Sequence, residues 1–226
     1  KWHLGDQAWY PQHQGYVVNK GGCDYGQPPS YFDPFNQPQH KHPMIRAGIP
    51  GLEGVKPGQY LTHREGDEAR QFILDHQDAP FFLYYCPYAV HTPIQAIPEV
   101  AAKYKREGKT EVNAKYAAMV ESVDDAVGTI MQTLREANAI ENTIVIFTSD
   151  NGGLKGPTDN TPLRSGKGYA YVGGIRVPMI VRWPGVVAPG GTSDEPVISV
   201  DLLPTIAEAT GVALPANREI DGVSLA

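Results

Sequence analysis

The stretch "NTIVIFTSDNGG", residues 142–153, decides the fold that we expect for this chain. Its apolar run, Ile144–Phe147, predicts a buried strand. The run is followed by Asp150 and Asn151, and two glycines come directly after them. Ligands of α/β sheets lie beyond the carboxyl ends of the strands. A carboxylate and an amide at such a strand end therefore indicate a functional site.

Three further apolar runs predict the rest of a sheet. "APFFLYYC" (79–86) is continuous enough for a strand buried on both faces. "IRVPMIVRWPG" (175–185) and "EPVIS" (195–199) predict two more strands. Helices are expected between them, so the order of elements predicts an α/β fold. Its sheet should be mostly parallel or mixed, flanked by helices and incomplete.

Helical patterns appear in three places. Thr62 and Glu65 form a capping-box pattern, which predicts a helix start. One face of that helix should carry Ala69, Phe72, Ile73 and His76. An apolar stripe predicts a second helix over roughly 112–137, and "VDLLPTIAEATG" (200–211) predicts a short one that stops at Gly211.

Residues 1–58 lack such periodicity and are rich in Gly, Pro, Gln, Tyr and His. We expect irregular loops on the substrate side there, and the α/β core in residues 59–226. Aromatic residues of the 21–50 segment either stack on a sugar ring or pin the loop to the body: Tyr25, Tyr31, Phe32 and Phe35. Three neighbouring side chains are candidates for binding additional anionic groups: His40, Lys41 and His42.

The composition excludes several classes of protein. The 226 residues have a net charge of -6, which argues against a general nucleic-acid binder. No apolar run reaches the roughly 20 residues that span a bilayer, and no targeting signal is visible. The two cysteines, Cys23 and Cys86, are expected to be unlinked thiols. Because the chain starts at Lys1 and not at methionine, we expect an internal piece of a longer protein.

Several residues have side chains suited to chemistry. Asp150 and Asn151 offer hard oxygen ligands for Ca²⁺ or Mg²⁺, although "DNGG" also suits a plain turn. Lys167, between glycines in "LRSGKG", suits an oxyanion such as phosphate or sulfate, or is simply a solvated loop lysine. His91, in "YAVHTP", is either catalytic or a hydrogen-bonded loop residue. Lys1 and His3, in "KWHLG", share one face of an extended segment or form a frayed cationic end.

Taken in order, these motifs resemble a known family. The sequence runs from "KWHLG" through "PFFLY" and "HTP" to "FTSDNGG", "LRSGKG" and "GGIRVP". This series resembles the formylglycine-dependent sulfatases (arylsulfatase-like) of the alkaline-phosphatase superfamily. The resemblance covers nearly the whole chain, and "RWPG" and "SVDLLPTI" extend it.

The resemblance implies a mechanism and its residues. Asp150 and Asn151 would bind one calcium ion. Lys1 and His3 would hold a formylglycine, while Lys1, His91 and Lys167 would bind sulfate and assist the leaving oxygen. The implied substrate is a sulfated small molecule or glycan, and the implied location is periplasmic, secreted or lysosomal. Neither the exact substrate nor the oligomeric state follows from the sequence.

The chain also departs from the family pattern. It holds no C-x-P-x-R or S-x-P-x-R motif, from which formylglycine is made. The motif and an early Asp-Asp calcium pair are expected upstream of Lys1, and a C-terminal subdomain after Ala226. We therefore expect this piece alone to be inactive.

Two alternatives remain open. One is a phosphatase, phosphodiesterase or phosphonate hydrolase of the same superfamily, although Asn151 after the acid favours one hard cation over two zinc ions. The other is a noncatalytic protein that binds sulfated glycans.

Overall fold

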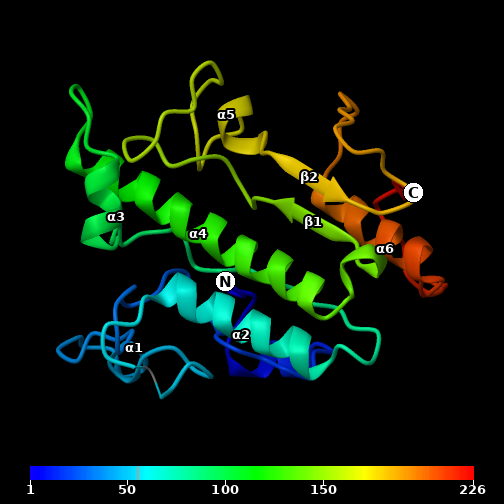
Figure 1. The fold of residues 1–226 in the computed structure, drawn as a ribbon, viewed down its shortest axis with the longest axis horizontal. Coiled ribbons are helices and arrows are strands. Elements are labelled where there is room, and N and C mark those ends of the chain that lie inside the picture. The colour runs from blue at the N-terminus through cyan, green and yellow to red at the C-terminus, as the bar shows by residue number, and fades with distance from the viewer. Residues whose placement is uncertain (55) are drawn as a thin grey trace. The chain divides into compact units, whose positions relative to one another are not determined.

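The computed structural model describes residues 1–54 and 56–226. The chain divides into two compact units, Lys1–Pro184 and Gly185–Ala226, and each is described by itself. Figure 1 labels the main elements. The α-helices are α1 (Pro43–Ala47), α2 (Leu61–Asp75), α3 (Pro98–Lys103), α4 (Glu111–Glu136), α5 (Val172–Ile175) and α6 (Leu202–Thr210). The strands are β1 (Val145–Thr148) and β2 (Met179–Arg182), and short 3-10 turns cover Gln7–Trp9, Pro11–His13, Ile140–Asn142 and Ser199–Asp201.

The long helices α2 and α4 pack side by side and form the frame of the first unit (Figure 1). The predicted helix over 112–137 is confirmed as α4. It begins at Thr110, which exchanges hydrogen bonds with Asn113 in a capping box. A Cβ placed at Gly66 of α2 would lie 3.1 Å from the Cβ of Ala126 in α4. Small residues at this crossing therefore let the two helices approach closely.

The start of α2 differs from the predicted capping box. The helix begins after Tyr60 without a side-chain cap, and Thr62 and Glu65 are buried inside it. Backbone contacts replace the cap, because the Leu61 amide donates to the Tyr31 carbonyl at 2.8 Å. The predicted apolar face is confirmed at Ala69 and Ile73, which are buried.

The α/β class is confirmed, and its sheet is small within the described residues. β1 and β2 pair antiparallel, with Ile146 opposite Val181 and Phe147 opposite Ile180. Both strands lie in runs predicted to be strands. The strand predicted over 79–86 is wrong as a paired strand, since no described segment forms a ladder with it. Phe82 and Tyr84 are each 55% exposed there.

The irregular first part of the chain is fixed to the core by its aromatic residues. Tyr31 and Phe35 are fully buried, and the Tyr31 ring stacks on Tyr60 at 5.8 Å between centroids. This corrects the sugar-stacking alternative for these two residues, because their rings are closed off from any ligand. Cys23 and Cys86 are free thiols, as expected.

The second unit, Gly185–Ala226, is built around α6. The helix ends at Gly211, whose φ of 69° gives the predicted left-handed stop. The predicted strand over 195–199 is wrong: Ile198 is 65% exposed, and its amide bonds to the Asp201 carboxylate at 2.9 Å. Asp201 also accepts a bond from the Val223 amide at 3.0 Å. A side-chain cap thus takes up the backbone group that a sheet partner would need.

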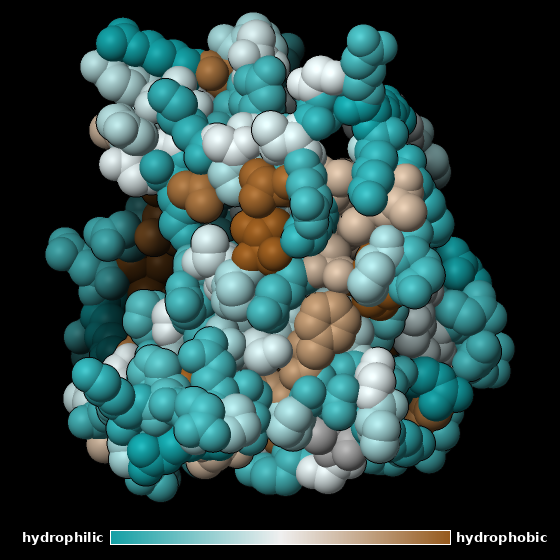
Figure 2. Space-filling view, turned by 90° about the vertical axis from the view of Figure 1, so that its left-hand side faces the viewer, coloured by the Kyte–Doolittle hydropathy of each residue, from teal (hydrophilic) through white to brown (hydrophobic). Residues whose placement is uncertain are grey.

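Polar side chains dominate the face of the molecule drawn in Figure 2, where brown apolar groups occupy only small areas between teal ones. This distribution agrees with a sequence that contains 19% charged residues of both signs. Among the described helices, none has the length and apolar character needed to cross a membrane.

Candidate active site

One cavity of about 570 Å³ brings together the four predicted catalytic residues. Lys1, His3, His91 and Lys167 all line it, although they are up to 166 positions apart in the sequence. The remaining lining residues are Tyr25, Gly26, Gln27, Pro28, Pro29, Gln37, His40 and Ile45. A cavity of this size suits a small organic ligand. The cavity is therefore the candidate active site.

His91 follows the extended 79–88 segment and is held by several hydrogen bonds. Its amide donates to the Tyr88 carbonyl at 3.0 Å, and its carbonyl accepts the Tyr31 hydroxyl at 2.9 Å. The ring Nδ1 lies 3.1 Å from the Thr92 carbonyl oxygen. In the tautomer that donates Nδ1–H to that carbonyl, Nε2 keeps a lone pair for proton transfer.

The N-terminal segment is fixed against two loops. The main-chain nitrogen of Lys1 lies against the carbonyls of Cys86 and Pro87. The His3 amide donates to the Cys23 carbonyl at 2.9 Å. His3 has a φ of 49°, which is uncommon for a residue other than glycine. A Cβ at Gly26 would lie 2.9 Å from the His3 ring, so Gly26 gives that ring its space.

The glycines after Asn151 explain how Lys167 reaches the cavity. A Cβ at Gly152 would overlap the carbonyl oxygen of Gly173, so only glycine permits this approach. The Gly152 amide donates to the Gly174 carbonyl at 2.9 Å, and the Lys167 amide donates to the Gly153 carbonyl at 3.0 Å. The end of β1 and the lysine loop are thereby joined by backbone hydrogen bonds.

The charges at the cavity influence one another. The pKa of Lys1 is lowered by burial and then by the charge of Lys167, while Asp150 opposes the shift. The pKa of His91 is also lowered, chiefly by burial; its bond to Thr92 opposes this, and the charges of Lys1 and Lys167 add to it. The two neighbouring ammonium groups therefore form a concentrated positive region that favours an oxyanion, while the lowered pKa of His91 favours its neutral ring.

Asp150 and Asn151 lie outside the lining of the cavity, at the end of β1. Asp150 is exposed and Asn151 is half-buried. Their carboxylate and amide oxygens fit a hard cation such as calcium, which takes six to eight oxygen ligands. In the described part of the chain, no group of three or more His, Cys, Asp or Glu side chains is arranged for a metal. Asp150 and Asn151 supply oxygen atoms of the type that calcium takes, and their assignment as its ligands stays a prediction.

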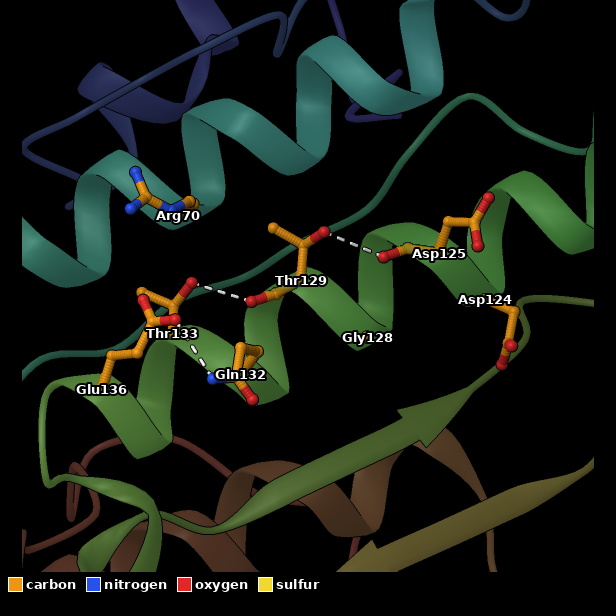
Figure 3. A pocket seen from close by; sticks show the side chains of 8 residues that line it. All are labelled: Arg70, Asp124, Asp125, Gly128, Thr129, Gln132, Thr133 and Glu136. Atoms are coloured by element: carbon orange, nitrogen blue, oxygen red, sulfur yellow. Dashed lines mark hydrogen bonds between the residues drawn. The ribbon is translucent and has the colours of Figure 1, made fainter.

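A second hollow, of about 450 Å³, lies along α4 and is unrelated to the predicted residues (Figure 3). Its hydroxyls bond within the helix, since Thr129 donates to the Asp125 carbonyl and Thr133 to the Thr129 carbonyl. Gln132 likewise bonds to Glu136 one turn on. Because these polar groups are already paired along α4, the geometry assigns this hollow no catalytic role.

Sequence reasoning did not single out Gln27, Gln37 and Ile45 as cavity residues. Gln27 and Gln37 lie in irregular loops and Ile45 in the short helix α1, and no sequence periodicity shows which way their side chains point. His40 was a candidate for binding anions, and it does line the cavity, whereas the neighbouring Lys41 and His42 are exposed and do not. Contacts through space, and not local pattern, distinguish these neighbours.

Comparisons with known proteins agree with this arrangement. The family model described as Sulfatase matches residues 1–212. A protein named Sulfatase from Formosa agariphila is 41% identical over 191 residues, which cover 77% of this chain and 34% of that protein. Human Arylsulfatase A is 33% identical over 259 aligned positions, which cover 100% of this chain and 46% of the relative.

A solved structure, that of Ps i-CgsB in complex with k-i-k-neocarrahexaose, is similar over 99% of this chain and 52% of its own length. Its TM-score is 0.89 and its identity is 35%. The chain thus spans between about a third and a half of the length of these relatives. With the family model matching almost from end to end, the chain belongs to the sulfatase family.

Proposed function

We propose that the intact protein hydrolyses sulfate esters of sulfated carbohydrates, and that this chain supplies most of the sulfate-binding wall. The observation that carries the proposal is the shared cavity of Lys1, His3, His91 and Lys167. Its positive groups suit a substrate with a tetrahedral anionic centre. Names among the relatives, such as N-acetylgalactosamine-6-sulfatase and the carrahexaose complex of Ps i-CgsB, support a carbohydrate substrate.

Each cavity residue has a role that follows from its chemistry. The ammonium groups of Lys1 and Lys167 would bind sulfate oxygens and stabilise the charge that grows on them. His91 would take up a proton on Nε2 and, as the imidazolium, give it to the bridging oxygen, while Nδ1–H stays bonded to the Thr92 carbonyl. His3, held beside Gly26, would orient the nucleophile together with Lys1.

The proposed reaction also needs a nucleophile and a metal ion. A formylglycine upstream of Lys1 would supply the nucleophile. One calcium ion would supply positive charge at the sulfate oxygens, with Asp150 and Asn151 among its ligands. We further propose that residues 1–58 form the substrate-side loops and residues 59–226 the core of the catalytic domain, in a protein located outside the cytoplasm.

The proposal is tested with the intact protein, two substrates and two variants. We expect turnover of a small aryl sulfate, little turnover of the matching aryl phosphate, and loss of aryl sulfate turnover in Lys167→Ala and His91→Ala. Removing a group that stabilises developing oxyanion charge lowers kcat by roughly 100- to 1000-fold. Lys155→Ala is the matched control, because Lys155 is an exposed lysine of the same glycine-rich loop and does not line the cavity.

The outcomes separate the alternatives. Faster turnover of the phosphate would favour a phosphatase or phosphodiesterase of the same superfamily. Binding of sulfated glycans without any turnover would favour a noncatalytic binding protein. A lower Tm with intact kinetics in Lys167→Ala and His91→Ala would refute the roles given to these residues.

A further inference from the structure

The candidate active site has room and charge for more than one sulfate group. We infer that it contains a second anion subsite at His40, and that the preferred substrate is a sugar with another sulfate or a carboxylate beside the scissile sulfate. This inference rests on the proposed function and deepens it by naming the substrate class. Three observations carry it.

The first observation is the charge of the lining. Two lysines and three histidines line the cavity, and no Asp or Glu is among its lining residues in the described chain. The whole sequence is acidic, with 25 Asp and Glu against 19 Lys and Arg. A lining with two lysines and no acidic side chain, within an acidic protein, concentrates positive potential where the substrate binds. Such a surface favours a ligand with more than one negative group.

The second observation is size. A cavity of about 570 Å³ is in the range that holds a whole small organic ligand, far beyond one sulfate group. Lys1, His3, His91 and Lys167 serve the sulfate, so the remaining lining is available to the leaving group. That lining belongs to the 25–45 segment and includes His40 as its ionisable imidazole.

The third observation is that His40 is held in place. Its Nδ1 accepts the His42 amide at 3.1 Å, so the neutral ring carries its hydrogen on Nε2. The Arg46 guanidinium donates to the carbonyls of His40 and Lys41 at 3.2 and 3.3 Å. The His40 amide donates to Gln37 at 2.9 Å. In the neutral ring, Nε2–H is therefore a fixed donor.

Gln27 links the two parts of the cavity. Its Oε1 accepts the Thr92 hydroxyl at 2.9 Å, next to His91. This bond fixes the amide and leaves its NH₂ group as a donor in the same cavity. The lining of the 25–45 segment thus offers donors to ligand oxygens at both Gln27 and His40.

The test uses the intact protein and a matched pair of galactose disaccharides that carry one and two sulfate groups. Calorimetry gives the Kd of each, and aryl sulfate turnover is measured separately. We expect the wild type to bind the disulfated sugar more tightly. His40→Ala should reduce that preference by roughly 10-fold or more, the effect of losing one hydrogen bond to a charged group.

Two further variants sharpen the result. His40→Lys should keep the preference, because an ammonium N–H donor takes the place of the Nε2–H donor. Lys41→Ala should also keep it, since Lys41 is exposed and does not line the cavity. Turnover of the small aryl sulfate should stay unchanged in Lys41→Ala, whose side chain lies outside the cavity. An unchanged preference in His40→Ala, or an equal loss in Lys41→Ala, would overturn the subsite. Absent aryl sulfate turnover in the wild type would instead contradict the proposed function, and the binding ratio would still decide the subsite.

Discussion

Replacing Glu65 with glutamine is expected to stabilise the intact protein at pH 8 far more than at pH 5. Glu65 lies in α2 with 9% of its surface exposed, and its Oε2 has no hydrogen-bond partner in the described chain. Burial raises the pKa of Glu65 to about 8, against the opposing effects of the N-terminal amine and the Tyr88 amide bond. Where a peptide bond replaces that amine, the first opposing effect disappears.

Whether stability rises or falls with pH depends on which form of the Glu65 carboxyl the folded state favours. The folded protein favours the protonated acid, whereas the unfolded chain ionises near the ordinary value of 4.5. The wild type therefore loses stability as the pH rises from about 4.5 to about 8. One pKa unit corresponds to about 1.4 kcal/mol, so the loss is below about 1 kcal/mol at pH 5 and reaches up to about 4 kcal/mol at pH 8.

Glutamine at position 65 removes this dependence of stability on pH, because it does not ionise, and it has nearly the same side-chain shape as glutamate. Its Oε1 can still accept the Tyr88 amide, which donates to Glu65 at 3.2 Å. Its extra N–H group lowers the free energy of unfolding by roughly the same amount at every pH. The decisive quantity is therefore how the free energy of unfolding changes with pH, and not its value at one pH. Urea unfolding from pH 5 to pH 8.5 measures that slope for the wild type and for Glu65→Gln.

Glu68→Gln is the matched control, since Glu68 lies one turn further along α2 in ion pairs with Lys20 and Arg64. Its difference from the wild type should be small and constant over this pH range. A constant difference for Glu65→Gln as well would refute the reasoning, because it would mean that the Glu65 carboxyl ionises alike in the folded and unfolded states.

Three further predictions concern the intact protein or the chain itself. Asp150→Ala should lower calcium affinity and sulfate ester turnover together, because the proposed site loses a carboxylate ligand. Titrating activity with calcium checks this, and unchanged turnover at limiting calcium would contradict it. Gly152→Ala should lower both Tm and turnover, since its Cβ would overlap the Gly173 carbonyl oxygen. Gly128→Ala is the control, because a Cβ there meets open space in α4. This control should leave turnover unchanged and raise stability by roughly 0.5–1 kcal/mol. The 226-residue chain alone should not hydrolyse an aryl sulfate even with calcium, because its sequence contains no C/S-x-P-x-R motif; measurable turnover by the purified chain would require a different nucleophile.

The elements that the sequence predicted well are those that local pattern determines. The apolar stripe predicted α4, and Gly211 was predicted to end α6. The 79–86 run was predicted to be a strand from its apolar character, but a strand also needs a backbone partner. No described segment supplies one, and a sequence pattern does not state where a partner lies.

Glu65 shows how one pattern can have two meanings. Thr62 followed by Glu65 is typical of a helix start, yet both residues are buried one turn or more inside α2. Glu65 stands four residues before Ala69 and eight before Ile73, so it lies on the buried face of the helix. The spacing of Glu65 from Ala69 and Ile73 indicates a buried position, but the pattern was interpreted as a capping box.

The candidate site was predictable where glycine and histidine motifs mark it. Four predicted residues line one cavity, and Asp150 lies close enough to influence the pKa of Lys1 and His91. The wall formed by the 25–45 segment was not predictable in detail. Buried Tyr31 and Phe35 cannot be distinguished in sequence from exposed loop aromatics, because only tertiary packing decides their burial.

The backbone bonds of Gly152 and Gly153 have a consequence for how the cavity can change during evolution. They tie the segment that follows Asp150 to the loop of Lys167, so a shift that enlarges the cavity at Lys167 would also displace Asp150, and with it the proposed calcium ligand. The opposite wall, which carries Gln27 and His40, has no hydrogen bond to the 150–174 segment in the described structure. Relatives that act on different leaving groups should therefore vary in length and residue type within 25–45, while the spacing from Asp150 to Lys167 stays nearly constant.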